Sequence, residues 1–224
     1  MKLAMSIPAS QGWLLAVLGR LRKNFLLKSV GTSAFMVLFF IAYGYILKNP
    51  LHPFSVMPAT AIDRLVPFSP IALPIYASLW LYVSLPPALI ESRSSLIAYG
   101  MAAAAMCLAG LISFLIWPTA VPPADIDWAL YPGFGILKSV DLTGNACPSL
   151  HAASAVFSCV WLDRQLRELG GNPLSRYLNA LWCAAIVYST IATRQHVALD
   201  ALAGIALGVV AAILSRPFVS PVPR

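Results

Sequence analysis

Three ionisable residues, Arg194, His196 and Asp200, stand between two strongly apolar runs of the sequence. If this segment is helical, His196 and Asp200 lie one turn apart on one face, because residues at i and i+4 are neighbours on a helix. A carboxylate placed there can hold an imidazole in one tautomer while the ring attacks phosphorus. Ionisable groups at membrane depth are costly and usually line a cavity or take part in chemistry. His196 is therefore a candidate nucleophile.

A second polar cluster, Asn145 to Ala152, contains Pro148, Ser149 and His151. Proline suits the first turn of a helix, and the free N–H groups at such a helix start, with the Ser149 hydroxyl, are predicted to bind an anion. His151 would face the same pocket and could protonate a leaving oxygen. Arg194 could pair with phosphate oxygens in a forked geometry. These residues indicate phosphoryl transfer with no cofactor and no obligatory metal, because no Asp/Glu cluster would hold one.

The composition is typical of a single membrane domain. Of the 224 residues, 59% are hydrophobic and 10% charged, with a mean hydropathy of +0.79, whereas an average soluble domain carries roughly 25% charge. The net charge of +7 does not indicate nucleic-acid binding, because the basic residues lie at the ends of apolar runs. The four cysteines lack paired spacing, so no disulfide framework or zinc site is predicted. No cleaved signal sequence is expected either.

Six apolar segments approach the roughly 20 residues that cross a bilayer. The sequence therefore predicts an all-α fold, an integral membrane bundle of six transmembrane helices within residues 29–216. Residues 1–28 precede it, with an amphipathic interfacial helix over 10–28 or, alternatively, a disordered basic tail. A C-terminal tail, 217–224, follows. The six segments are 29–47, 71–90, 94–117, 142–162, 177–193 and 197–215.

Loop lengths and charges predict an orientation. With six spans both termini lie on one side, which carries 11 of the 15 basic residues and is therefore expected to be cytoplasmic. The long links at 48–70 and 118–141, the Cys147–His151 region and the Arg194–His196 segment then share the opposite face. Scattered structural residues would not converge in this way, whereas an active site would. The compact chain favours a bacterial inner membrane, with the site at the periplasmic or outer face.

These motifs resemble those of the type 2 phosphatidic acid phosphatase superfamily of integral membrane enzymes. Its Pro-Ser-x-His motif matches Pro148 to His151, and its basic residue followed by His-x3-Asp is similar to Arg194 to Asp200. The six-span plan and the order of the motifs also agree. The resemblance implies that His196 is the nucleophile, that His151 is the general acid and base, and that Asp200 orients His196.

Two features depart from the usual pattern of that family. One residue, Gln195, separates Arg194 from the histidine where most members have five, and the first motif, Lys-x6-Arg-Pro, is absent. The segment 62–70 instead looks like the branch containing inositol phosphorylceramide synthases.

The residues that bind the substrate phosphate are therefore less defined. Ser149 is one candidate, although it could simply cap a helix. The others, in falling order, are Arg194, Lys138 and Arg64, and Arg194 could instead be an interfacial anchor.

Three functions are compatible with these residues. The first is a lipid-phosphate phosphatase that acts in the bilayer on phosphatidic acid, phosphatidylglycerol phosphate or an isoprenoid pyrophosphate through a phosphohistidine. The second is a head-group transferase of the inositol phosphorylceramide synthase type, with an alcohol in place of water as acceptor. The third is a non-enzymatic membrane protein that binds haem through His151 and His196. The sequence predicts no oligomeric state.

Overall fold

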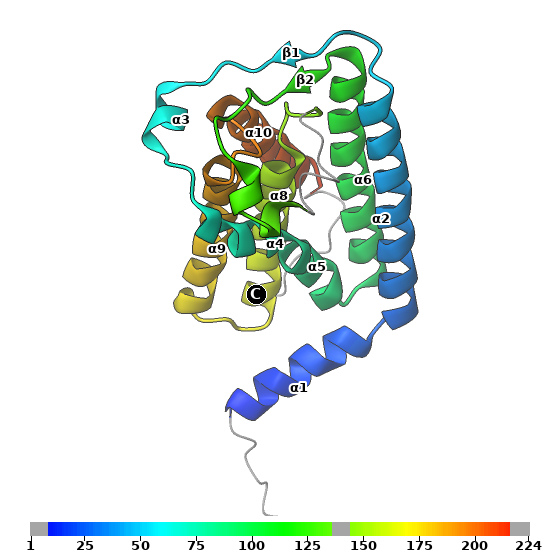
Figure 1. Ribbon diagram of the computed structural model, residues 1–224. Helices are drawn as coiled ribbons and strands as arrows, with labels where there is room; N and C mark the ends of the chain where they lie inside the picture. The colour runs from blue at the N-terminus through cyan, green and yellow to red at the C-terminus, as the bar shows by residue number, and fades with distance from the viewer. Residues whose placement is uncertain (1–8, 136–143, 216–224) are drawn as a thin grey trace, which may run out of the picture.

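A helix lies at each of the six apolar segments that the sequence singles out. The computed structural model describes residues 9–135 and 144–215, with side chains from residue 12 onward. In chain order the elements are α1 (Ala9–Arg22), α2 (Phe25–Lys48), β1 (Ser55–Val56), α3 (Ala61–Leu65), the 3-10 helix η1 (Pro70–Ala72), α4 (Leu73–Ala77), α5 (Leu79–Leu89), α6 (Arg93–Ile116), β2 (Thr119–Ala120), the 3-10 helix η2 (Trp128–Leu130), α8 (Leu150–Glu168), α9 (Pro173–Ala192) and α10 (Ala198–Ser215). Figure 1 shows them as a helical bundle with the strands at one end and α1 at the other.

Four helical segments of the described chain are long and apolar enough to cross a membrane. They are α2, the combined segment Pro70–Leu89, α6 and α10. The helices α8 and α9 have similar lengths, 19 and 20 residues, but α8 ends in charged side chains and both are less apolar. Length and composition therefore support four crossings, and the count of six stays a prediction.

The predicted fourth segment, 142–162, begins earlier than the helix found there. The helix α8 begins only at Leu150, and Ser149 is its N-cap, whose hydroxyl accepts the Ala152 N–H at 3.2 Å. Pro148 therefore lies before the cap and not in the first helical turn. A serine N-cap satisfies one of the orphan N–H groups of a helix start, and this local bond sets the boundary. The helix also continues to Glu168, beyond the predicted end.

The predicted N-terminal helix over residues 10–28 is divided in two. The helix α1 ends at Arg22, and Asn24 adopts a left-handed backbone conformation with φ of 58°, which asparagine tolerates better than most residues. Residues 25–28 therefore belong to α2 and not to the first helix. The proposed tail at 217–224 lies outside the described residues.

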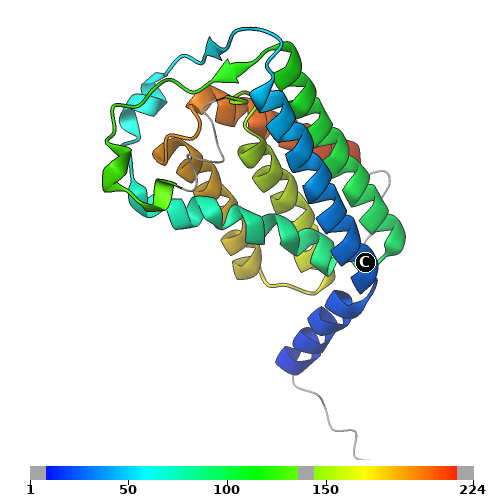
Figure 2. The same ribbon diagram turned by 45° about the vertical axis from the view of Figure 1, so that its right-hand side comes forward.

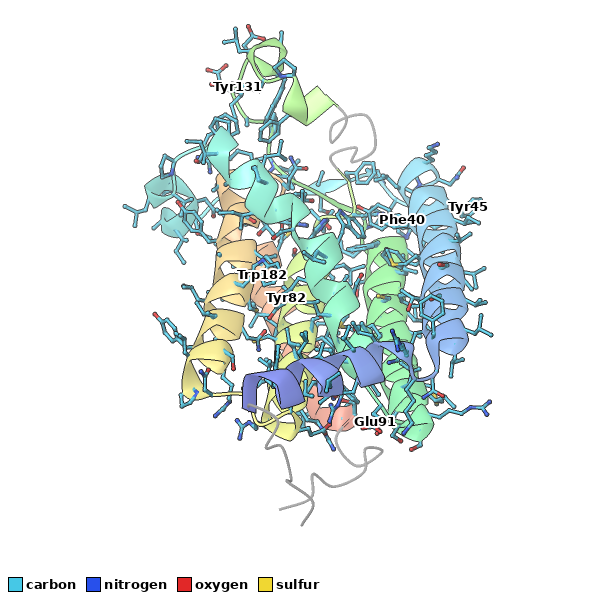
Figure 3. All side chains as sticks on the ribbon, turned by 90° about the horizontal axis from the view of Figure 1, so that it is seen from below. Phe40, Tyr45, Tyr82, Glu91, Tyr131 and Trp182 are labelled. Carbon is cyan, nitrogen blue, oxygen red and sulfur yellow. The ribbon has the colours of Figure 1, made fainter. Side chains whose placement is uncertain are left out.

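The helix α8 forms the centre of the bundle. One apolar cluster joins Phe157 of α8 to Phe114 of α6 and Ala212 of α10. A second joins α8 to α5 and α9 through Tyr82 and Ile186. Figure 3 shows Tyr82 and Trp182 meeting in this second cluster. The helix α2, by contrast, lies at the edge of the bundle, beside α6 in both ribbon views (Figures 1 and 2).

Two glycines allow α10 to approach α8 at backbone distance. A Cβ atom added at Gly204 would overlap the carbonyl oxygen of Ser149, and one added at Gly208 would overlap that of Ala153. Small residues four apart permit close approach of membrane helices. The Ser149 N–H also donates to the Asp200 carbonyl at 2.9 Å. The N-terminal ends of α8 and α10, which carry the two polar motifs, are therefore held side by side.

The two long links meet at the end of the bundle where the polar motifs lie. The strands β1 and β2 pair in parallel, with Ser55 opposite Thr119. Thr119 in turn accepts the Ala146 N–H on its carbonyl and the Cys147 N–H on its hydroxyl. The long links and the segment before α8 thus share one end of the molecule, as the alternation of loop lengths predicts.

The opposite end is formed by α1 and a set of ion pairs. Arg20 pairs with Glu168 at 3.1 Å, and Lys23 pairs with Glu91 at 2.7 Å. The buried Lys28 ammonium donates to the carbonyls of Arg20 and Ala88. Figure 3 shows Glu91 beside α1, far from Tyr131 at the other end.

Candidate active site

His196 lies in the turn between α9 and α10. The turn is a Schellman motif, in which the Gln195 N–H donates to the Thr190 carbonyl and the Arg194 N–H to the Ile191 carbonyl. Arg194 occupies the left-handed position, with φ of 59°, where glycine is usual and another residue costs roughly 1–2 kcal/mol. The His196 N–H shares the Thr190 acceptor at 3.0 Å. The backbone on both sides of the imidazole is therefore fixed.

Asp200 lies in the first turn of α10, beneath His196. Its Oδ2 accepts the Val197 N–H at 3.1 Å and lies 3.6 Å from His196 Nδ1. His196 Nδ1 and Asp200 Oδ1 are both buried, and neither has a hydrogen-bond partner among the described residues. Burying unpaired polar atoms is costly, and a hydrogen bond between these two atoms would satisfy both. The arrangement suits a carboxylate that holds the imidazole tautomer.

His151 enters the site from the first turn of α8. Its ring centroid lies 5.6 Å from that of His196, although the two residues are 45 positions apart in the sequence. Its Nε2 is 2.7 Å from the hydroxyl of Tyr76 on α4, and the two rings stack. Trp80 of α5 packs edge-on against the same imidazole. His151 is therefore held by α4 and α5 and presented toward His196.

A buried carboxylate from the first long link supports the His196 turn. Asp63 Oδ2 accepts the N–H and the hydroxyl of Thr60, and its Oδ1 accepts the Ala198 N–H at 2.8 Å. Arg194 donates to the carbonyls of Asp63 and Val66 at 3.0 and 2.9 Å. The first long link therefore accepts hydrogen bonds from the segment around His196 both through the Asp63 side chain and through two backbone carbonyls. Asp63 accepts one N–H at the start of α10, and Asp200 accepts the preceding one.

The environment of Asp63 favours its ionised form. Burial by itself would raise the pKa of Asp63, but the hydrogen bonds from Thr60 and Ala198 and the charge of Arg194 outweigh it and hold the pKa below its ordinary value. A carboxyl group whose pKa is lower in the folded than in the unfolded protein stabilises the fold at pH values above its unfolded pKa of about 4. That contribution is lost as the pH falls through the folded pKa.

The Asp63→Asn variant is therefore expected to be less stable at neutral pH. An amide has a single acceptor oxygen, whereas three donors point at this carboxylate, so the loss should be about 1–3 kcal/mol. The midpoint of thermal unfolding in detergent measures it, and the gap to the unchanged protein should narrow as the pH falls below about 4. Asp125→Asn, in an exposed link, is the control. Equal midpoints at pH 7 for Asp63→Asn and the control would contradict the supporting role.

Both histidines open onto one large apolar cavity of about 920 Å3. Its walls are formed by α2, α5, α6 and α8, with His151, His196 and Tyr76 at one end and Lys28 at the other. The lining is mostly aromatic and aliphatic. The site therefore combines two imidazoles with space for hydrocarbon.

The predicted phosphate-binding residues are only partly brought together. Ser149 is fully buried and its hydroxyl caps α8, Arg194 is bound to the two carbonyls, and Arg64 is exposed on α3. None of these three lines the cavity. Lys138 lies outside the described residues.

Sequence reasoning missed three residues of the site. Tyr76 contacts His151, Asp63 supports the His196 turn, and Lys48 lines the cavity from the last turn of α2. The sequence of 62–70 indicates a family branch but no role for Asp63, and Lys48 is a basic residue at the end of an apolar run, which does not distinguish it from the others. A threonine three residues before an aspartate is a capping-box signal, and it would have indicated a helix at Asp63.

Comparison with known proteins bears on the same residues. The family model of the PAP2 superfamily matches residues 93–223. The matched region includes both histidines and Asp200, but neither Tyr76 nor Asp63. No curated protein and no solved structure matches the chain.

Proposed function

Because the chain belongs to the PAP2 superfamily, whose members are phosphatases or phosphotransferases, we propose that it is an integral membrane lipid-phosphate phosphatase. The observation that carries the proposal is the meeting of two motif histidines, 5.6 Å apart between ring centroids, at the end of an apolar cavity. A phosphate ester with a hydrocarbon tail would place its head between the imidazoles and its tail in the cavity. Asp200, 3.6 Å from His196, supplies the carboxylate that a nucleophilic imidazole needs.

The proposed reaction has two steps. His196 Nε2 attacks phosphorus, so that a P–N bond forms while the bond to the leaving oxygen breaks, and His151 gives that oxygen a proton. A water then attacks the phosphohistidine, His151 takes its proton, and the P–N bond breaks to release phosphate. Asp200 stabilises the positive charge on His196 through Nδ1. The Tyr76 hydroxyl lies 2.7 Å from His151 Nε2, so an oxygen atom can come within hydrogen-bond distance of this nitrogen, as proton transfer requires.

The phosphate contacts are proposed from position and charge. The N-terminus of α8 presents a partial positive charge beside the site, and Lys48 lines the cavity on the same face. Arg194 can reach a phosphate only with the N–H groups that Asp63 and Val66 leave free. In the proposed orientation this end faces the periplasm, because the arginines and lysines of α1, α8 and α9 gather at the other end.

A transferase is the second candidate, and the lining of the cavity favours it. An apolar cavity next to the histidines admits the alcohol of a second lipid as readily as water, and that alcohol could accept the phosphoryl head group. The segment 62–70, whose sequence resembles the inositol phosphorylceramide synthase branch, contacts the His196 turn through Arg194.

Purified protein in detergent is expected to release phosphate from at least one lipid phosphate in the presence of a chelator. The panel is phosphatidic acid, phosphatidylglycerol phosphate and an isoprenoid pyrophosphate, each assayed with and without a lipid alcohol. Free phosphate identifies a phosphatase, and a new phospholipid that forms only with the alcohol identifies a transferase.

Two results of this assay would contradict the proposal. Turnover that requires a divalent cation would exclude the histidine mechanism as written. Absence of either product from the whole panel, together with a haem absorption band in the purified protein, would favour the non-enzymatic alternative.

A further inference from the structure

The apolar cavity continues far beyond the histidines. On α2 its lining extends from Lys48 to Lys28, and the other walls are formed by α5, α6 and α8. We refer to the part between the histidines and Lys28 as the tail groove. The helix α2 packs mainly against α6, so the groove borders the gap between α2 and α5, where a lipid could enter from the bilayer.

The depth of the tail groove follows from helix geometry. Phe40 of α2 contacts Trp80, and Trp80 contacts His151, so the reacting head group lies near the level of Phe40. Lys28 is twelve residues earlier on α2, which corresponds to about 18 Å at 1.5 Å per residue. The buried Lys28 ammonium donates to the carbonyls of Arg20 and Ala88, so polar groups close the far end of the groove. We refer to them as the Lys28 floor.

The cavity is long enough for an extended hydrocarbon chain. Its lining on α2 runs from Leu27 to Lys48, a length of about 32 Å at 1.5 Å per residue.

Two glycines leave the far half of the groove open. Gly31 and Gly100 both line the cavity, and a Cβ atom added at either meets nothing within 4 Å. They occupy the seventh and eighth positions of α2 and α6, two 24-residue helices that begin at the same end. Gly31 is nine residues before Phe40, or about 13 Å below the head group.

We propose that the tail groove binds one hydrocarbon tail of the substrate and that its far half, at Gly31 and Gly100, selects for tail length. A saturated chain advances about 1.3 Å per carbon, the projection of a C–C bond of about 1.5 Å. An eight-carbon tail therefore ends before Gly31, whereas an extended sixteen-carbon tail, about 21 Å long, passes both glycines and reaches the level of the Lys28 floor. This inference rests on the proposed function for the head group, but not on whether water or an alcohol is the acceptor.

Octyl and hexadecyl phosphate in identical mixed micelles test the proposal with Gly31→Trp and Gly100→Trp. Each indole would fill the far half of the groove, so kcat/KM for hexadecyl phosphate should fall by about 10–100-fold, since each buried methylene contributes appreciably to binding. The value for octyl phosphate should change by less than about twofold, because its tail ends earlier. Gly19→Trp on α1, whose added Cβ also meets nothing within 4 Å, is the matched control.

Binding of radiolabelled hexadecyl phosphate, measured without turnover, tests the tail groove independently of the proposed phosphatase activity. Weaker binding of the long tail in both groove variants supports the groove even if no phosphate is released, in which case the proposed function fails alone. Equal losses for both tails, or no loss for either, would overturn the groove proposal while leaving the phosphatase intact.

Discussion

The His196→Ala variant is expected to lose essentially all turnover, by a factor on the order of 10^4 or more. His196 is the group proposed to form the covalent bond to phosphorus, and neither Asp200 nor His151 can replace it. The side chain is buried and its backbone N–H is bound to the Thr190 carbonyl, so truncation leaves the turn in place. Phosphate release from the best lipid of the panel measures the effect, with unfolding midpoints to show that the variant is folded.

The His151→Ala variant provides the contrast that identifies the two roles. A general acid contributes about 10^2–10^4-fold, and it matters less when the leaving group departs without a proton. With p-nitrophenyl phosphate the defect of His151→Ala in the first step should therefore shrink, whereas that of His196→Ala should persist. Folded His196→Ala protein with unaltered activity would refute the nucleophile assignment, and the opposite leaving-group pattern would exchange the roles.

Replacing Gly204 by alanine is expected to damage both stability and activity. The added methyl group would overlap the Ser149 carbonyl oxygen, which belongs to the backbone and cannot rotate away, so α10 must move from α8. Forced overpacking of this kind costs about 1–3 kcal/mol. The same movement separates His196 from His151, and a shift of about 1 Å in a reacting group can reduce the rate 100-fold.

Thermal unfolding and kcat are both measured for Gly204→Ala. Gly208→Ala is a second variant at the contact between α8 and α10, and Gly19→Ala is the control. Gly208 packs against Ala153, one turn further from the site, so its substitution should affect stability as much but kcat less. If Gly204→Ala keeps both the midpoint and kcat of the unchanged protein, the close approach of α8 and α10 does not set the geometry of the site.

The sequence predicts the parts of the fold that depend on apolar length and on local spacing. Residues 29–47 and 94–117 contain no Asp, Glu, Lys or Arg. Each range coincides with a long helix, and the predicted ends differ from the observed ends by four residues or fewer. The spacing of His196 and Asp200 likewise predicts their proximity. Periodicity and composition suffice for such features because they are properties of one segment.

Contacts between distant segments could not be predicted in the same way. Tyr76 and His151 are 75 positions apart, and Asp63 and Ala198 are 135 apart, so no local pattern links them. The start of α8 differs from the predicted one because residues 142–149 carry no charged side chain that would mark a boundary, whereas the Ser149 cap decides where the helix begins. The sequence Gly204-Ile205-Ala206-Leu207-Gly208 does contain the small-residue spacing of packed membrane helices, but that spacing does not identify the partner helix.

The backbone contact between α8 and α10 has a consequence for how this protein can diversify. Carbonyl groups and glycines set the separation of these two helices, so that separation does not depend on the volume of the side chains on α2. The helix α2 lies outside the matched family region, 93–223, and packs on α6 instead of on α10. Substitutions on α2 before Phe40, away from Lys48 and from both histidines, are therefore expected to alter the proposed tail groove before they alter the chemistry.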